Sequence, residues 1–353
     1  MQDPRLIRLG LSVLGTSRFS RLLAPICRGM GAILMLHHVV PGGGEQGGFN
    51  PNRGLEIRPE FLNSTIEHLQ RRGVELISLA EAVERIRRGA VGSQPFATVT
   101  IDDGYRDALD YAVPILRRHR VPYAIFVASA IADGTCELWW RILELAIRDH
   151  DEIIAELPEG TITRPTRTLA QKRSAFLALY WPVRRMDQHV QRRWIREFAA
   201  RYGIDVDGYC RSVALDWSEL RSLTEDPLCT IGAHSINHFA MSRLPAREAL
   251  AEMTGSADRI ERELGRRPDF FAFPYGDESS AGPRDFDLAR EAGFAAALTT
   301  AKGLVSQDNA RSLWGLPRLS LNGDYQRLDY LDVLMSGVPF AARDIARRLL
   351  DRI

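Results

Sequence analysis

Two histidines separated by three residues, His234 and His238, are the clearest candidates for a metal site in this sequence. An H-x-x-x-H segment can direct two imidazoles at one ion, either from a helical turn or from a wide loop. A chain with 8 histidines in 353 residues should contain roughly 0.2 such pairs by chance, so the motif alone is weak evidence. Two solvated loop histidines are the simpler alternative.

A pair of acids, Asp102-Asp103, strengthens the case for a metal, because it follows the apolar run Phe96–Ile101 and precedes Gly104. Neighbouring side chains of a strand point to opposite faces, so two adjacent carboxylates share a site only where the chain leaves the strand. One carboxylate can complete a His₂Asp set with an open position for water, which is typical of catalytic zinc. The other can take a proton from that water. A helix N-cap is the alternative, and it accounts for one aspartate better than for two.

Two more polar groups also follow apolar runs. His37-His38 could supply a general acid, because the pKa of histidine lies near neutrality. Pro274-Tyr275-Gly276 could direct a backbone N–H at a developing oxyanion from behind a rigid proline. Taken alone, this second segment is more simply a plain turn.

The elements that carry these groups alternate between strand and helix patterns. Strands are predicted over 32–36, 74–77, 96–101, 123–127, 228–233, 270–273, 294–298 and 316–321. Helices are predicted over 59–73, 78–88, 107–119, 245–264 and 284–292, with another that Asp216 caps. This alternation predicts a parallel α/β sheet or barrel, whose strands all end on one face. We therefore expect the four polar groups to meet at one site.

Residues 135–215 break the alternation, with a charged and aromatic helical pattern and no good strand. We interpret them as a helical insertion in a (β/α) domain that spans residues 31–325. Residues 1–30 are expected to form an N-terminal helical extension, and residues 326–353 a C-terminal helical segment.

Composition excludes several classes of protein. Hydrophobic residues make up 45% and charged residues 26%, which is ordinary for a globular chain. The net charge of +1 gives no reason to expect a nucleic-acid partner, and no apolar stretch is long enough to span a membrane. Four widely spaced cysteines and no clear signal peptide favour a cytoplasmic protein. Contact of the arginine-rich N-terminus with anionic lipid remains an alternative.

Motifs of other enzyme classes are missing or lack their structural context. A G-x-G-x-x-G segment at 42–47 follows a strand, but no helix pattern follows it to bind a pyrophosphate. The sequence has no P-loop and no G-x-S-x-G elbow.

Three segments in this order and spacing, TIDDGY (100–105), HSINH (234–238) and FAFPYG (271–276), resemble the NodB-homology polysaccharide deacetylases, carbohydrate esterase family four. The resemblance extends over residues 30–322, with 135–215 as an insertion. It implies a distorted (β/α) barrel with fewer strands than a complete TIM barrel. It also implies a divalent metal, most often zinc, and hydrolysis of N-acetyl groups from amino-sugar oligo- or polysaccharides.

The resemblance assigns roles by position. Asp102 corresponds to the general base, and the metal ligands correspond to Asp103, His234 and His238. The backbone N–H of Tyr275 corresponds to the donor that holds the oxyanion.

Two departures from the family pattern need other residues. Ala272 stands where the family has an arginine that orients the base, and Arg318 is our candidate for that role. Gly323 stands where a late motif usually ends in the acid histidine. The segment LMLHHVV resembles the Y-H-x-V start of a subgroup that acts on poly-N-acetylglucosamine-type chains, which makes His37 the acid by position and His38 the second choice.

The expected reaction releases acetate and a free amino sugar, and Trp139, Trp140 or Trp314 could stack on sugar rings, although packing is the simpler role for most of them. Two other functions stay open at this stage. The chain could be a non-catalytic carbohydrate-binding descendant of the fold, or a hydrolase of another C–N bond in a small amide or cyclic imide.

Overall fold

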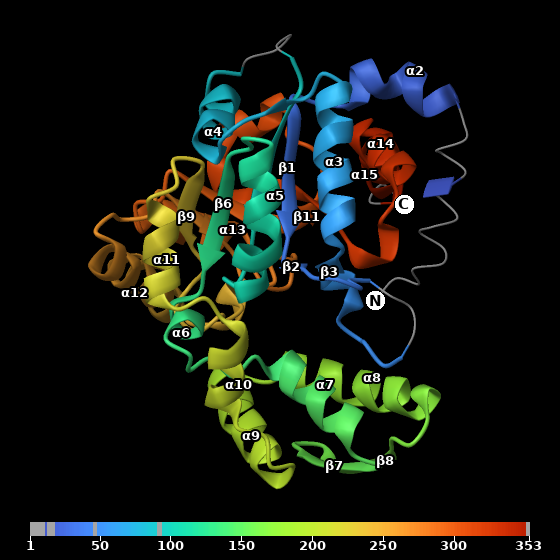
Figure 1. The fold of residues 1–353 in the computed structure, drawn as a ribbon, viewed down its shortest axis with the longest axis vertical. Coiled ribbons are helices and arrows are strands. Elements are labelled where there is room, and N and C mark those ends of the chain that lie inside the picture. Colours follow the sequence, from blue (N-terminus) through green and yellow to red (C-terminus); the bar gives the residue numbers. More distant parts are fainter. Residues whose placement is uncertain (1–10, 13–17, 45–47, 90–93, 351–353) are drawn as a thin grey trace.

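The computed structural model describes residues 11–12, 18–44, 48–89 and 94–350. Figure 1 shows a large body of strands and helices with a smaller lobe below it. Seven parallel strands of the described residues form a closed ring in the order β1-β12-β11-β10-β9-β6-β5, because β1 pairs with both β12 and β5. They are β1 (Gly31–Leu36), β5 (Phe96–Ile101), β6 (Tyr123–Val127), β9 (Cys229–Ala233), β10 (Phe270–Ala272), β11 (Ala296–Lys302) and β12 (Leu316–Ser320). The expectation of a (β/α) barrel with fewer strands than a TIM barrel is confirmed.

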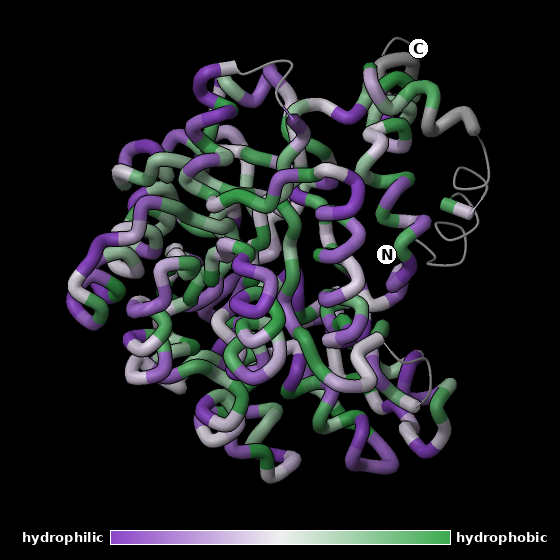
Figure 2. Tube along the Cα trace, turned by 45° about the horizontal axis from the view of Figure 1, so that its top comes forward, coloured by the Kyte–Doolittle hydropathy of each residue, from purple (hydrophilic) through white to green (hydrophobic). Residues whose placement is uncertain are grey.

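The strands are buried along their whole length where the sequence is most apolar. All six residues of β1 and all six of β5 are buried, since one face of each strand fills the barrel and the other packs against helices. Figure 2 shows hydrophobic segments running through the middle of the body and hydrophilic ones at its edge. Short β4 (Glu75–Leu76) pairs with the start of β5, and β2 (His38–Val39) pairs with β3 (Glu56–Ile57).

Helices lie outside the ring (Figure 1). They are α3 (Pro59–Arg71), α4 (Leu79–Arg87), α5 (Val113–Arg118), α6 (Ser129–Ala132), α11 (Trp217–Thr224), α12 (Ala246–Leu264) and α13 (Pro283–Glu291). The predicted Asp216 cap is present as a capping box with Glu219, and at the start of α4 the Ser78 side chain accepts the N–H of Glu81. The helix predicted over 107–119 differs in its first part, which is a π-helical segment over Ala108–Ala112. Pro114 lacks the N–H that a regular helix would need there.

The insertion forms the lower lobe in Figure 1. It contains α7 (Trp139–Asp149), β7 (Glu152–Leu157), β8 (Gly160–Pro165), α8 (Leu169–Arg185), α9 (Gln188–Arg201) and α10 (Val206–Val213). The insertion is mostly helical, as predicted, but the expectation that it contains no strand is wrong, because β7 and β8 form an antiparallel hairpin. Burial alternates strictly along β7, and this two-residue period is present in the sequence as the buried Ile153, Ala155 and Leu157.

Helices also occupy both terminal segments: α2 (Arg18–Cys27) precedes β1, and α14 (Leu328–Met335) and α15 (Val338–Leu350) follow β12. Residues 1–10 and 13–17 of the expected N-terminal extension lie outside the described residues. No described helix is both long enough and apolar enough to cross a bilayer. Short 3₁₀ turns occupy Arg53–Leu55, Met241–Arg243, Gln307–Arg311, Leu313–Gly315 and Gly323–Tyr325.

Candidate active site

The register of the strands brings the predicted groups together. Leu36 lies opposite Ile101, so His37 and Asp102 leave neighbouring strands at the same level, and the N–H of Asp102 donates to the carbonyl of Leu36 at 2.9 Å. In the same way the N–H of His234 donates to the Val127 carbonyl at 2.9 Å. The carboxyl ends of these strands therefore form one face, as expected for a parallel barrel.

Three side chains converge on this face with their ligating atoms close together. Oδ1 of Asp103 lies 3.2 Å from Nε2 of His234 and 3.1 Å from Nε2 of His238. All three side chains are almost completely buried, and Oδ1 of Asp103 has no hydrogen-bond partner. Nδ1–H of His234 donates to the carbonyl of Ala272 at 2.7 Å, which leaves Nε2 unprotonated and directed at Asp103.

The donor set and its spacing fit a divalent cation. Ligands about 2.0–2.2 Å from a tetrahedral zinc ion are about 3.3 Å apart, close to the observed separations. Burial lowers the pKa of His238 to about 4, so its imidazole is neutral and able to bind a metal. Burial opposes ionisation of Asp103, but the neighbouring imidazoles of His238 and His234 hold the pKa of this carboxyl well below its usual value. At neutral pH His238 and Asp103 therefore have the protonation states that ligands need.

Backbone strain is concentrated at the same place. Asp103, Ser235, His238 and Tyr275 have φ between 54° and 74°, in the left-handed region that non-glycine residues seldom adopt. They are four of the six such residues in the described part of the chain. Strained conformations persist only where surrounding contacts hold them, and they gather at functional sites.

Glu252 of α12 holds the loop between the two histidines, and the sequence analysis did not identify it. Its Oε2 accepts the backbone N–H groups of Ile236 at 3.0 Å and Asn237 at 2.8 Å, and its Oε1 accepts the Asn237 side chain at 2.6 Å. The carboxylate is buried, and burial raises its pKa. A signal was available in the sequence, because Glu252 lies on the same helical stripe as the buried Ala249 and Ser256.

We expect Glu252→Ala to weaken zinc binding by roughly 10–100-fold, the usual cost of losing a group that orients metal ligands. The variant leaves two loop N–H groups without their acceptor, so His238 loses its fixed position. Competition with a chromogenic chelator measures the affinity, and Glu248→Ala, at a partly exposed position on the same helix, is the matched control. Unchanged zinc affinity in a folded Glu252→Ala protein would contradict this role.

Asp102 is held by a buried arginine. Nη1 of Arg318 lies 2.7 Å from Oδ1 of Asp102, Nη2 lies 2.6 Å from Oδ2, and Nε donates to the Thr299 carbonyl at 2.8 Å. Arg318 is 1% exposed. Burial alone would raise the pKa of Asp102, but the Arg318 guanidinium outweighs this effect and keeps the pKa below its usual value. Asp102 is therefore ionised at neutral pH, and the arginine comes from β12 rather than from position 272.

The two histidines after β1 have different surroundings. Nε2 of His37 lies 4.0 Å from Oδ2 of Asp102. Burial lowers the pKa of His37, although Asp103 and Asp102 act to raise it. His38 instead places Nδ1 2.6 Å from Oδ2 of Asp107 and stacks on the ring of Tyr105.

The turn at Pro274-Tyr275 is fixed by the lobe and by β11. The Tyr275 hydroxyl accepts Nε1–H of Trp139 at 2.8 Å, and the Arg184 guanidinium carbon lies 3.8 Å above the tyrosine ring. The Thr300 hydroxyl donates to the Tyr275 carbonyl at 2.6 Å. The lobe thus contacts the predicted oxyanion donor directly.

The predicted aromatic contacts with sugar need correction. Trp139 is completely buried and donates to Tyr275, and the ring of Trp140 lies 5.0 Å from that of His238, so Trp140 packs against a predicted metal ligand. The structure does not bring Trp314 to the site. It precedes β12, at the amino end of the barrel, and its Nε1–H donates to the Phe294 carbonyl at 2.7 Å.

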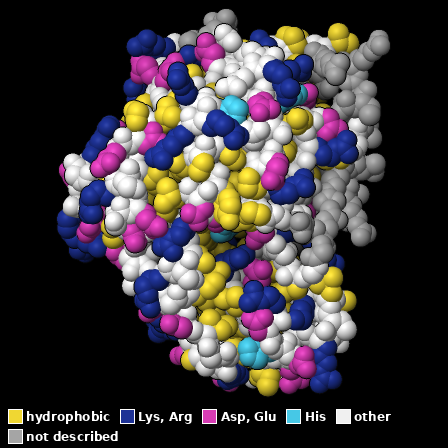
Figure 3. All heavy atoms as spheres, in the orientation of Figure 1, with side chains coloured by type: hydrophobic (Ala, Val, Ile, Leu, Met, Phe, Trp, Pro, Cys, Tyr) yellow, Lys and Arg dark blue, Asp and Glu magenta, His cyan; other side chains and the backbone are white. Residues whose placement is uncertain are grey.

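Figure 3 shows a hollow between the body and the lobe, with hydrophobic and charged side chains along it. The predicted metal ligands are buried, but His37 and Tyr275 beside them are partly exposed, so solvent reaches the edge of the candidate site.

Comparison with known proteins agrees with this geometry. Residues 182–297, which include His234, His238 and Tyr275, match the polysaccharide deacetylase family model. No curated protein sequence matches the chain.

Solved structures share the fold at low sequence identity. The Streptococcus pyogenes deacetylase PplD, in complex with acetate, has a TM-score of 0.56 at 14% identity over 86% of this chain and 97% of its own. IcaB from Ammonifex degensii has a TM-score of 0.54 at 17% identity over 88% and 97%. A de-N-acetylase from Aggregatibacter actinomycetemcomitans has a TM-score of 0.53 at 15% identity over 86% and 98%. Residues 182–297 are thus similar to the polysaccharide deacetylase family, and the solved structures share the barrel fold of this chain.

Proposed function

We propose that this protein is a metal-dependent hydrolase that removes N-acetyl groups from oligo- or polysaccharides containing N-acetylglucosamine. The observation that carries the proposal is the convergence of Asp103, His234 and His238, with the ionised Asp102 beside them. Three protein ligands leave a position open for water and substrate, which is typical of a catalytic site.

A divalent cation held by these three residues would supply Lewis acidity, which lowers the pKa of water toward about 7 and polarises the acetamide carbonyl. Zinc is our choice of metal, because two imidazoles and one carboxylate match its preferred ligands.

Asp102 acts as the general base in this proposal. Its carboxylate is ionised and fixed by two hydrogen bonds from Arg318, so it can accept a proton from the attacking water without rearranging. A positioned base of this kind typically contributes about 10²–10⁴ in rate. Arg318 is a positioning residue, because it acts through Asp102.

The backbone N–H of Tyr275 is the proposed oxyanion donor. Among the described residues this N–H has no hydrogen-bond acceptor, and the left-handed conformation of Tyr275 is held by contacts on its ring and on its carbonyl. One such donor is typically worth about 10²–10³ in kcat.

His37 is the proposed general acid that protonates the departing amine. Nε2 of His37 lies 4.0 Å from Oδ2 of Asp102, whereas Nδ1 of His38 is engaged with Asp107, so we favour His37 over His38. We expect His37→Gln to lower kcat about 10²–10⁴-fold with little change in zinc affinity or KM. A His37→Gln protein with normal turnover, together with an inactive His38→Gln protein, would reverse this assignment. His68→Gln, at a histidine outside the site, is the control.

The experiment that tests the proposal is a measurement of acetate released from N-acetylglucosamine oligomers, before and after removal of metal and after addition of zinc. Metal-dependent release supports the proposal. Oligosaccharide binding with no release would favour a non-catalytic carbohydrate-binding protein, and release only from small amides or cyclic imides would favour the other C–N hydrolase. We also propose a cytoplasmic location, which the four unpaired cysteines support.

A further inference from the structure

The lobe reaches the loop of the second predicted metal ligand through two buried side chains of α9. Nη2 of Arg192 lies 2.5 Å from the carbonyl oxygen of Asn237 and 3.4 Å from that of His238. One helical turn earlier, Oε1 of Gln188 accepts the N–H of Ala240 at 2.8 Å. The backbone is therefore bonded to the lobe both before and after the imidazole of His238.

Two opposite charges hold the peptide that precedes His238. Glu252, from the barrel helix α12, accepts the N–H of Asn237 at 2.8 Å. Arg192, from the lobe, donates to the carbonyl of the same residue. Charge-assisted hydrogen bonds of this kind are about twice as strong as neutral ones. His238 itself has a φ of 54°, and such a strained conformation persists only where surrounding contacts hold it. The barrel and the lobe each supply one of these contacts.

The surroundings of Arg192 are not those of a residue that only stabilises the fold. Its Nε and Nη1 have no hydrogen-bond acceptor among the described residues, although Nε lies 3.5 Å from Oε2 of Glu137. Burial of such groups without acceptors costs free energy of folding. The guanidinium carbon lies 5.1 Å from the ring centre of Phe239, which is a further contact with the same loop. The contacts of this buried cation thus favour the loop of the metal ligand.

We propose that Arg192 is a positioning residue, which couples the lobe to the metal site by fixing the backbone of His238. This role rests on the metal site of the proposed function and makes the lobe part of it. Without the guanidinium, the loop keeps its contact with Glu252 but loses the opposite one. The imidazole then departs from the geometry that a metal ion requires, and the affinity for the metal falls.

The zinc affinity of Arg192→Met, measured by competition with a chromogenic chelator, tests the proposal. Methionine keeps an unbranched apolar stem, and Glu137 retains Arg196 as a partner at 2.8 Å. We expect roughly 10–100-fold weaker zinc binding. The midpoint of denaturant unfolding of the metal-free protein should change little, because apolar replacement of a buried cation is often tolerated when its partner stays paired. Arg192→Lys should recover part of the zinc affinity, since it returns the charge and a donor.

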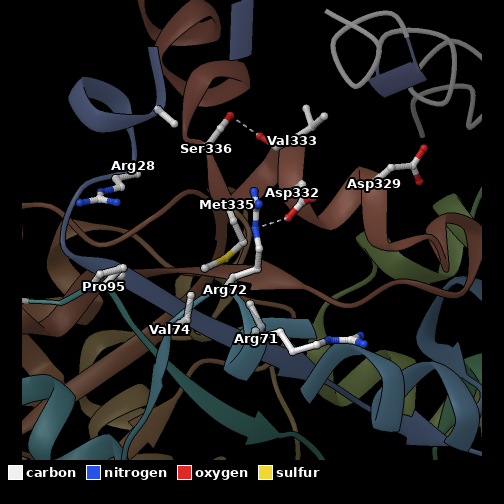
Figure 4. Close-up of a pocket in the computed structure, with 13 residues that line it drawn as sticks. Arg28, Arg71, Arg72, Val74, Pro95, Asp329, Asp332, Val333, Met335 and Ser336 are labelled. Carbon is white, nitrogen blue, oxygen red and sulfur yellow. Dashed lines mark hydrogen bonds and ion pairs between the residues drawn. The ribbon is translucent and has the colours of Figure 1, made fainter. Parts of the chain in front are cut away.

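Two arginine variants serve as controls and should bind zinc as tightly as the parent chain. Arg196→Met is matched, because Arg196 lies on the same helix and pairs with the same Glu137, but its other ion pair is with Asp207. Arg72→Met is distant, because Arg72 pairs with Asp332 beside a cavity of about 600 Å³ at the amino end of the barrel (Figure 4).

Unchanged zinc affinity in a folded Arg192→Met protein would overturn this role and leave the proposed function intact. An equal loss of affinity in Arg196→Met would also overturn it, because the effect would then be a general one of the helix. A parent chain that binds no zinc would refute the metal site and this role together. If Arg192→Met does not fold, Arg192→Gln replaces it, and unchanged zinc affinity in that variant has the same meaning.

Discussion

The His234→Ala,His238→Ala protein is expected to bind zinc at least about a thousandfold more weakly than the parent chain and to release acetate no faster than background. Removing a residue that only orients a metal ligand lowers the affinity for the metal by roughly 10–100-fold. This variant removes two of the three predicted ligands themselves, so the loss of affinity should be larger. Asp103 alone cannot hold a catalytic ion in a fixed position. Chelator competition and acetate release measure the two effects.

The matched control is His150→Ala,His189→Ala, which removes two histidines that are not among the predicted metal ligands. His150 interacts with the carbonyl of Ala146 in the lobe, and His189 pairs with Glu248 at the surface. This control should keep the metal and the activity of the parent chain. Full activity in the His234→Ala,His238→Ala variant would refute the metal role.

Arg318→Met is expected to cost about 3–5 kcal/mol of unfolding free energy at neutral pH, because it leaves the Asp102 carboxylate buried without its partner. In the folded parent protein the pKa of Asp102 is lower than in the unfolded chain. The ion pair therefore stabilises the fold fully at pH values above the Asp102 pKa of the unfolded chain. This stabilisation is lost as the pH falls through the lower Asp102 pKa of the folded protein. Without the guanidinium, burial dominates and the pKa of Asp102 should rise above its usual value. Activity should then need a higher pH.

Denaturant unfolding at neutral and acidic pH tests the stability effect, and ¹³C NMR of the metal-free protein follows the titration of Asp102. Arg318→Lys should restore part of the stability, since it returns the charge without the two-point contact. Arg327→Met, at an exposed ion pair with Asp329, should have little effect. A depressed pKa of Asp102 in Arg318→Met would show that the arginine does not control its ionisation.

Two general rules are enough to predict, from the sequence, both the barrel and the clustering of the polar residues at one end of it. Fully buried strands are continuous apolar runs, and parallel strands all end on one face. His37, Asp102 and His234 each follow such a run directly, so their proximity follows from topology without knowledge of the register. Arg318 was also predicted, as the residue that orients Asp102 in place of the arginine missing at position 272, and the structure pairs the two side chains.

Other features depended on contacts that no local pattern specifies. Glu252 reaches back to Asn237 across a helix turn and a loop, so its role appears only in three dimensions. The wrong placement of Trp314 was avoidable, since it precedes its strand and must lie opposite the carboxyl ends. The hairpin of β7 and β8 was hidden because its two-residue period spans only six residues between strong helix patterns.

X-ray diffraction from crystals soaked in zinc, recorded on both sides of the zinc absorption edge, tests the central claim most directly. The account predicts one strong anomalous peak about 2.0–2.2 Å from Oδ1 of Asp103 and from Nε2 of His234 and His238. An active, zinc-loaded protein whose only anomalous peak lies away from these three atoms would contradict it.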